Sequence, residues 1–112
     1  MAKPAERAYS KVTQEAAALL GQQIRMARLE QRMTADDLAE RVGISRGLLQ
    51  RIERGDLGCA IGAVFEAAAV LGIPLFGIDH RGLTDRLAAN AHILTLLPKT
   101  ARPVQRPVKD DF

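Results

Sequence analysis

The stretch TADDLAERVGISRGLLQRIERG, residues 34–55, decides the expected fold. Thr34 is a good N-cap, and the two aspartates that follow complement the positive end of a helix dipole. Apolar residues then recur at helical spacing until Gly43, which can adopt the left-handed backbone that ends a helix sharply. Ser45 can cap the next helix, whose apolar residues repeat in the same way. The stretch therefore predicts two short helices joined by a tight turn.

The second of these helices directs polar groups outward. Its expected outward positions are Arg46, Gly47, Gln50, Arg51 and Arg54. The segment 41–54 contains four arginines and one acid, so positive charge is concentrated there. An arginine guanidinium is a planar fork of donors that matches the edge of guanine in the DNA major groove. We therefore expect this helix to touch double-stranded DNA, with Arg46 and Arg51 providing most of the sequence discrimination.

The run MTADDLAERVGISRGLLQRIERG resembles the helix-turn-helix of the Cro/C1-type (Xre family) regulators. The matching residues are Leu38, Ala39, Gly43, Ser45, Ile52, Glu53 and Gly55. The resemblance covers roughly residues 20–75, about half of the chain. It implies an all-α fold with a five-helix lambda-repressor-like DNA-binding domain. Apolar spacing and composition add the expectation of a C-terminal helix region and a disordered tail after it.

The resemblance also implies roles for individual side chains. Base edges would be met by Arg46, Gly47, Gln50 and Arg51, and DNA phosphates by Thr34, Ser45 and Arg54. A structural ion pair between Arg28 and Glu53 would clamp the first helix to the end of the reading helix. Two residues depart from the family pattern. Ala35 stands where the family often has a phosphate-binding glutamine, and Gly47 brings no side chain to the reading surface.

Charge and apolar spacing divide the chain into four expected parts. Residues 1–10 form a flexible N-terminal arm, and residues 11–75 form the helix-turn-helix domain. Its first helix begins at Ser10 or Thr13, ends near Gln31 and is followed, after the 34–55 stretch, by another helix that stops at Gly72. Residues 76–97 add a helix from about Thr84, and residues 98–112 form a disordered, basic, Pro-rich tail. The short run 75–80 fits either a helix or a strand.

Two interpretations remain open for the added helix and for the tail. The helix has an apolar stripe that a small DNA-binding domain does not need, so we expect it to dimerise; packing on its own bundle is the alternative. The stripe consists of Leu83, Leu87, Ala91, Leu94 and Leu97. The tail ends with Asp110, Asp111 and Phe112, which we interpret as a partner-binding segment. The alternative is a tail that only solubilises the chain.

Composition excludes several other classes of protein. The formal charge of +3 permits a nucleic-acid partner without requiring one. A single cysteine, Cys59, rules out an intramolecular disulfide and suits a reducing cytoplasm. No apolar run is long enough to span a membrane. His80 and His92 stand far from Cys59 in sequence and form no metal-binding motif, so we expect no metal, no cofactor and no catalytic site.

The expected function is sequence-specific repression of transcription by a homodimer on a palindromic operator. The segment VFEAAAVLGIPLF, the further helix and the ending KDDF are also similar to the HipB-type antitoxins. That resemblance implies an autoregulating antitoxin with a HipA-like kinase toxin as partner. The alternatives are a free-standing phage-type repressor and an adaptor that has the fold but binds no DNA.

Overall fold

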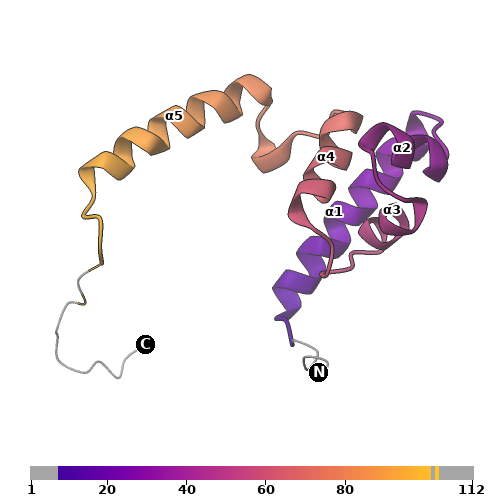
Figure 1. Ribbon diagram of the computed structural model, residues 1–112, viewed down its shortest axis with the longest axis horizontal. Helices are drawn as coiled ribbons and strands as arrows, with labels where there is room; N and C mark the ends of the chain where they lie inside the picture. Colours follow the sequence, from indigo (N-terminus) through magenta and orange to yellow (C-terminus); the bar gives the residue numbers. More distant parts are fainter. Residues whose placement is uncertain (1–7, 102, 104–112) are drawn as a thin grey trace. The chain divides into compact units, whose positions relative to one another are not determined.

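The computed structural model describes residues 8–101 and 103, and this part of the chain folds into α-helices (Figure 1). Its elements, in chain order, are α1 (Lys11–Glu30), α2 (Ala35–Val42), α3 (Arg46–Glu53), α4 (Ile61–Leu71), the short 3-10 helix η1 (Leu75–Gly77) and α5 (His80–Leu96). No strand occurs among the described residues. The predicted all-α class is therefore confirmed.

The chain divides into two units, Met1–Gly77 and Ile78–Phe112. In the first unit the described elements are α1 to α4 and η1, and in the second the described element is α5. The segment that fitted either a helix or a strand begins with the 3-10 helix η1. None of the described helices is both long and apolar enough to cross a membrane.

The turn between α2 and α3 has the local geometry that its sequence predicts. The Thr34 hydroxyl accepts a hydrogen bond from Asp37 N (3.0 Å), and the Asp37 carboxylate accepts one from Thr34 N (3.1 Å). This second bond lowers the pKa of Asp37, because it stabilises the charged carboxylate. Gly43 ends α2 at φ +82°, and Ser45 caps α3 by accepting from Leu48 N (3.0 Å). The starts of α2 and α3 are thus each set by a capping side chain, and the end of α2 is set by the left-handed backbone of Gly43.

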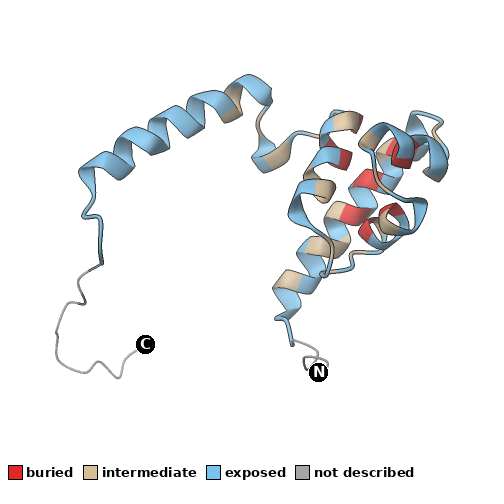
Figure 2. Cartoon of the chain, in the orientation of Figure 1, coloured by how far each residue is buried: buried red, intermediate tan, exposed pale blue. Residues whose placement is uncertain are grey.

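The core of the first unit lies where α1 to α4 converge. Figure 2 shows buried residues on all four helices. They are mostly aliphatic: Ile24 from α1, Leu38 and Ala39 from α2, Leu49 and Ile52 from α3, and Ala67 and Leu71 from α4. Residues this small form a core of limited volume, so its stability depends on close packing of the helix backbones.

Helix α1 approaches the C-terminal end of α3 at backbone distance. A Cβ atom placed on Gly21 would lie 2.5 Å from Ile52 O and 2.7 Å from Glu53 O. Gly55, at φ +79°, turns the chain directly after α3, and a Cβ there would lie 2.7 Å from Ala18 Cα. Glycine is required at both positions because any side chain would push α1 and α3 apart.

In the second unit, α5 begins earlier than its sequence suggested. Asp79 caps it by accepting a hydrogen bond from Gly82 N (2.8 Å), so the helix starts at His80 rather than near Thr84. Leu83 is half-buried, whereas Leu87 is 71% and Leu94 is 68% exposed. Within its own unit, most of the apolar stripe of α5 is therefore left exposed.

We expect Gly21→Ala to lower the free energy of unfolding by roughly 2 kcal/mol, because overpacking against rigid carbonyls outweighs the better helix propensity of alanine. Gly62→Ala is the matched control. Gly62 also lies in a helix, but a Cβ there would meet nothing within 4 Å. We expect it to leave stability unchanged or raise it by no more than about 1 kcal/mol. Urea denaturation measures both changes, and equal stabilities of the two variants would contradict the close contact.

Candidate nucleic-acid interface

The predicted base-reading residues of α3 all lie at the surface. Gly47 and Gln50 are exposed, and the Arg46 and Arg51 side chains are 60% and 44% exposed. A Cβ placed on Gly47 would meet nothing within 4 Å, so the middle of the helix surface is open. The structure therefore presents two arginines and one glutamine from a single rigid helix.

Arg46 is only loosely held by its neighbours. Its Nη1 lies 3.7 Å from Asp36 Oδ2, and both side chains are mostly exposed. An exposed pair at this distance contributes little to stability, and water or a nucleic acid can replace either partner at low cost. Arg46 is thus available to a ligand.

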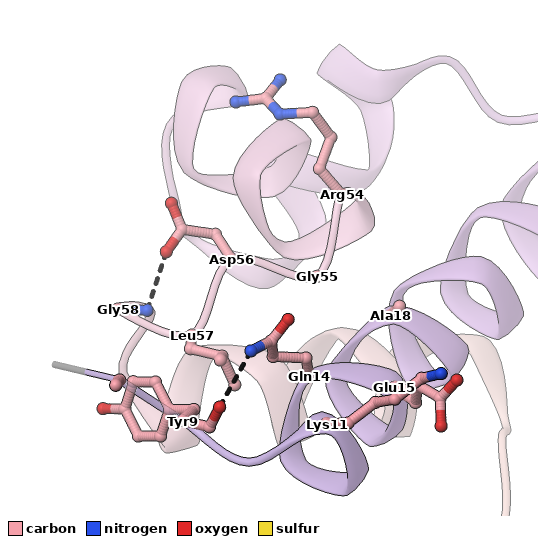
Figure 3. A pocket seen from close by; sticks show the side chains of 11 residues that line it. Tyr9, Lys11, Gln14, Glu15, Ala18, Arg54, Gly55, Asp56, Leu57 and Gly58 are labelled. Atoms are coloured by element: carbon pink, nitrogen blue, oxygen red, sulfur yellow. Dashed lines mark hydrogen bonds between the residues drawn. The ribbon is translucent and has the colours of Figure 1, made fainter.

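Arg51 is held more closely. Its Nε donates to Asp56 Oδ2 at 2.8 Å, and Asp56 Oδ1 accepts from Gly58 N at 2.7 Å (Figure 3 shows the second bond). These two hydrogen bonds lower the pKa of Asp56, with the Arg51 bond first, and the same contact raises the pKa of Arg51. The carboxylate thus fixes one edge of the guanidinium and leaves its two terminal nitrogens without a hydrogen-bond partner in the described part of the chain.

The predicted phosphate-binding residues are exposed as well. Thr34 and Ser45 use their hydroxyl oxygens as helix caps, so only their O–H groups remain to donate to a phosphate. The backbone N–H of Thr34 is already bonded to Asp37, whose carboxylate disfavours a phosphate nearby. Arg54 is exposed at the end of α3, and in Figure 3 its guanidinium points away from Tyr9 and Gln14.

Arg28 and Glu53 form a buried, bidentate ion pair. Arg28 Nε lies 2.7 Å from Glu53 Oε2, Arg28 Nη2 lies 3.0 Å from Glu53 Oε1, and only 10% and 7% of the two side chains are exposed. Arg28 Nη1 also donates to Met33 O at 3.0 Å. The hydrogen bond to Glu53 raises the pKa of Arg28, although burial opposes the shift. The pair joins α1 both to the end of α3 and to the residue before the Thr34 cap.

Other candidate sites lack converging reactive groups. The groove in Figure 3 lies between the start of α1 and the loop after α3, and Asp56 in its wall is already engaged by Arg51 and Gly58. Within the described residues, no three His, Cys, Asp or Glu side chains gather where a metal ion would bind. Burial raises the pKa of Cys59, which packs against the core. The geometry favours recognition by charge and hydrogen bonds.

Sequence reasoning did not identify two residues near this surface. Arg25 of α1 shares a surface depression with Gln50 and Arg54. Asp56, in the loop after α3, holds Arg51. The Asp-x-Gly turn at 56–58, five residues after an arginine, is a sequence signal for this contact. Residues 1–7 of the predicted arm lie outside the described residues, as do the predicted partner-binding residues Asp110, Asp111 and Phe112.

Comparison with known proteins agrees with this geometry. The sequence matches the family profile of a helix-turn-helix domain over residues 19–76, just over half of the chain. The matched span runs from within α1 to η1 and includes every exposed side chain of α3. No curated protein matches the chain. The chain therefore belongs to the helix-turn-helix domain family, a family of DNA-binding domains that serve in transcription regulation.

Proposed function

We propose that this protein is a sequence-specific transcriptional repressor that binds a palindromic operator as a homodimer. The observation that carries the proposal is the surface of α3, where Arg46, Gln50, Arg51 and Arg54 are exposed on one short helix. A helix of this size enters the major groove, where each base pair has a distinct pattern of donors and acceptors. A bound dimer would occlude the promoter.

The α3 surface separates base readout from phosphate contact. Arg46 and Arg51 carry terminal donors that match the O6 and N7 acceptors of guanine. Arg54, at the end of the helix, suits a phosphate, as do the hydroxyls of Thr34 and Ser45. Gly47 reads no base itself, but its open surface lets the helix backbone lie close to the groove floor. Few bases are specified in each half-site, and they are specified mainly by arginine.

We expect Arg51→Ala and Arg54→Ala to weaken binding in different ways. Arg51→Ala should relax the base preference at one position by about 1–3 kcal/mol, because it removes a bidentate contact to guanine. Arg54→Ala should weaken specific and random duplexes alike and lower the slope of log affinity against log salt by about one. The measurement is a salt titration of both duplexes, after the preferred sequence has been selected from a random pool.

The matched control is Arg81→Ala, which removes the same charge from the first turn of α5, outside the helix-turn-helix match. It should change neither the base preference nor the ranking of sequences. Equal losses on selected and random duplexes for both α3 variants would contradict base reading by Arg51. Absence of any selected sequence for the unaltered chain would contradict the proposed function as a whole.

We propose that α5 forms the dimer interface with a second copy of itself. Apolar residues recur along it with alternating spacings of four and three, and one polar residue interrupts them. The positions are Leu83, Leu87, Asn90, Leu94 and Leu97. This is the spacing of a helix pair that packs along one seam. Leu87, Leu94 and Leu97 are exposed, and such an apolar row is costly to leave in water.

A second copy fits this face better than an unrelated partner because the seam is nearly symmetric about its centre. Asn90 has one leucine three or four residues away on each side and another seven residues away on each side. A two-fold axis through Asn90 would therefore pair leucine with leucine and Asn90 with its own copy, where the two amides can hydrogen-bond. A polar residue in such a seam fixes the register of the two helices.

We expect Leu87→Glu to convert the dimer to a monomer, because the pair would have to bury two carboxylates in an apolar seam. His92→Glu is the control, since helical periodicity places position 92 on the opposite face of α5. It should leave the dimer intact. Sedimentation equilibrium at micromolar protein concentrations measures both variants. A monomeric unaltered chain, or a dimeric Leu87→Glu variant, would contradict this interface.

We further propose that the repressor is the autoregulating antitoxin of a HipBA-type pair, with a HipA-like kinase as its toxin. The proposal is supported by the similarity of its layout to HipB-type antitoxins, and by the 36 residues that follow the family match. The tail of that segment is basic and Pro-rich and ends with two aspartates and a phenylalanine, Asp110 to Phe112. The alternative is a free-standing phage-type repressor without a toxin partner.

Co-expression with a kinase-like protein encoded beside this chain tests the antitoxin proposal. We expect the full chain to capture that protein and a chain ending at residue 97 to capture much less, because the tail supplies the peptide that the kinase binds. Unchanged DNA binding by the shortened chain would show that it still folds. The absence of any such neighbouring gene, or of capture by the full chain, would favour the free-standing repressor.

A further inference from the structure

We propose that Asp56 is a positioning residue that fixes how Arg51 presents its guanidinium to a base. The inference rests on the proposed DNA-binding function and identifies a specificity-determining residue for the same surface. Asp56 lies just beyond α3, in the loop that leads to α4. It does not itself offer a donor to an acidic ligand, so its effect on recognition is exerted through Arg51.

The contact is anchored at both ends. Asp56 Oδ2 accepts from Arg51 Nε at 2.8 Å, while Asp56 Oδ1 accepts from Gly58 N at 2.7 Å. The backbone bond holds the carboxylate in place, so the pair does not depend on two freely moving side chains. A Cβ placed on Gly58 would lie 3.3 Å from Arg51 Nη2 and 3.2 Å from Asp56 Oδ1. The turn at 56–58 is therefore folded closely against the guanidinium.

The bond from Arg51 Nε to Asp56 determines which Arg51 donors remain for a base. A guanidinium can meet guanine through Nε and one Nη, or through both Nη groups at its end. With Nε bonded to Asp56, only the two terminal nitrogens remain for the guanine O6 and N7 atoms. Arg51 is then held in one conformation before it meets DNA, so less side-chain freedom is lost on binding. This arrangement favours guanine over the other bases, and it favours contact through the end of the guanidinium.

The carboxylate also affects binding that is independent of sequence. A negative charge beside Arg51 offsets the attraction of the surface for DNA phosphates. Arg51 then contributes little unless its terminal donors meet a matching base. Asp56 thus raises discrimination in two ways, by orienting Arg51 and by weakening contacts with any phosphate backbone.

Arg46 provides a comparison within the same helix. Its nearest carboxylate, on Asp36, lies 3.7 Å away, and no described backbone N–H holds that carboxylate as Gly58 N holds Asp56. The Arg46 side chain is thus free to adapt to different bases, whereas the Arg51 side chain is held in one conformation before DNA binds. The two arginines of the reading helix therefore differ in how strictly they discriminate.

Asp56→Asn separates the two bonds of the carboxylate. The asparagine oxygen can still accept from Gly58 N, but its amide nitrogen is a donor and repels Arg51 Nε. The loop bond is kept while the hold on Arg51 is lost. Glu66→Gln is the matched control, because it removes the same charge from an exposed position on α4. Asp56→Glu, which keeps a carboxylate, tests for rescue.

The experiment measures the full chain on a duplex selected from a random pool and on the same duplex with the Arg51-dependent guanine changed. For Asp56→Asn we expect the preference for that guanine to fall about tenfold, which is less than the loss of the whole bidentate contact would cause. We expect the affinity for random duplex to rise, because a negative charge has been removed. Glu66→Gln should keep the preference, and Asp56→Glu should recover part of it. In an Arg51→Ala background, Asp56→Asn should change the preference less than twofold.

Each result is decisive for one of the two proposals. An unaltered chain that selects no sequence would overturn the DNA-reading function itself. A selective chain whose Asp56→Asn variant keeps its preference would overturn only the role of Asp56, as would an effect of equal size in the Arg51→Ala background. If Asp56→Asn fails to unfold cooperatively, Asp56→Ser takes its place, because a serine hydroxyl can also accept from Gly58 N.

Discussion

The close approach of α1 to the C-terminal end of α3 is the constraint on which the rest of the first unit depends. Gly21 lets the α1 backbone approach the carbonyls of Ile52 and Glu53. Two turns further along α1, the Arg28–Glu53 ion pair joins the same two helices. Because Arg28 also bonds to Met33 O, the same side chain places the start of α2. One small region thus fixes the orientation of both helices of the reading motif, and the aliphatic core then fills the space between them.

The three ion pairs of the described chain have different roles because they differ in burial. The Arg28–Glu53 pair is almost fully buried, so losing either partner would leave an uncompensated charge and cost several kcal/mol, about 3 to 5. The Arg51–Asp56 and Arg46–Asp36 pairs lie at the surface and contribute little to stability. The loose Arg46–Asp36 pair is open to exchange with a ligand, whereas the Arg51–Asp56 pair leaves the two terminal nitrogens of Arg51 open. The buried arginine therefore holds the fold, whereas the two exposed arginines remain open to the proposed DNA partner.

The sequence predicted those features that depend on nearby residues. The caps at Thr34 and Ser45 and the turn at Gly43 follow from side chains within a few positions of the helix ends, so local rules suffice. The burial of Arg28 depends on the packing of distant helices, so only the family resemblance indicated its pair with Glu53. The Arg51–Asp56 bond was missed because it depends on how the loop after α3 folds back.

The proposed dimer follows from the small size of the reading surface. Two arginines, each contributing about 1–3 kcal/mol of discrimination, supply roughly 2–6 kcal/mol in one copy. Regulators that find one site in a genome need about 4–10 kcal/mol over non-specific binding. With Gly47 adding no side chain, a single copy falls short of much of that range. Two copies on two half-sites would reach roughly 4–12 kcal/mol, because the contributions of separate half-sites add. The proposed second copy would therefore supply specificity as well as cover the apolar stripe of α5.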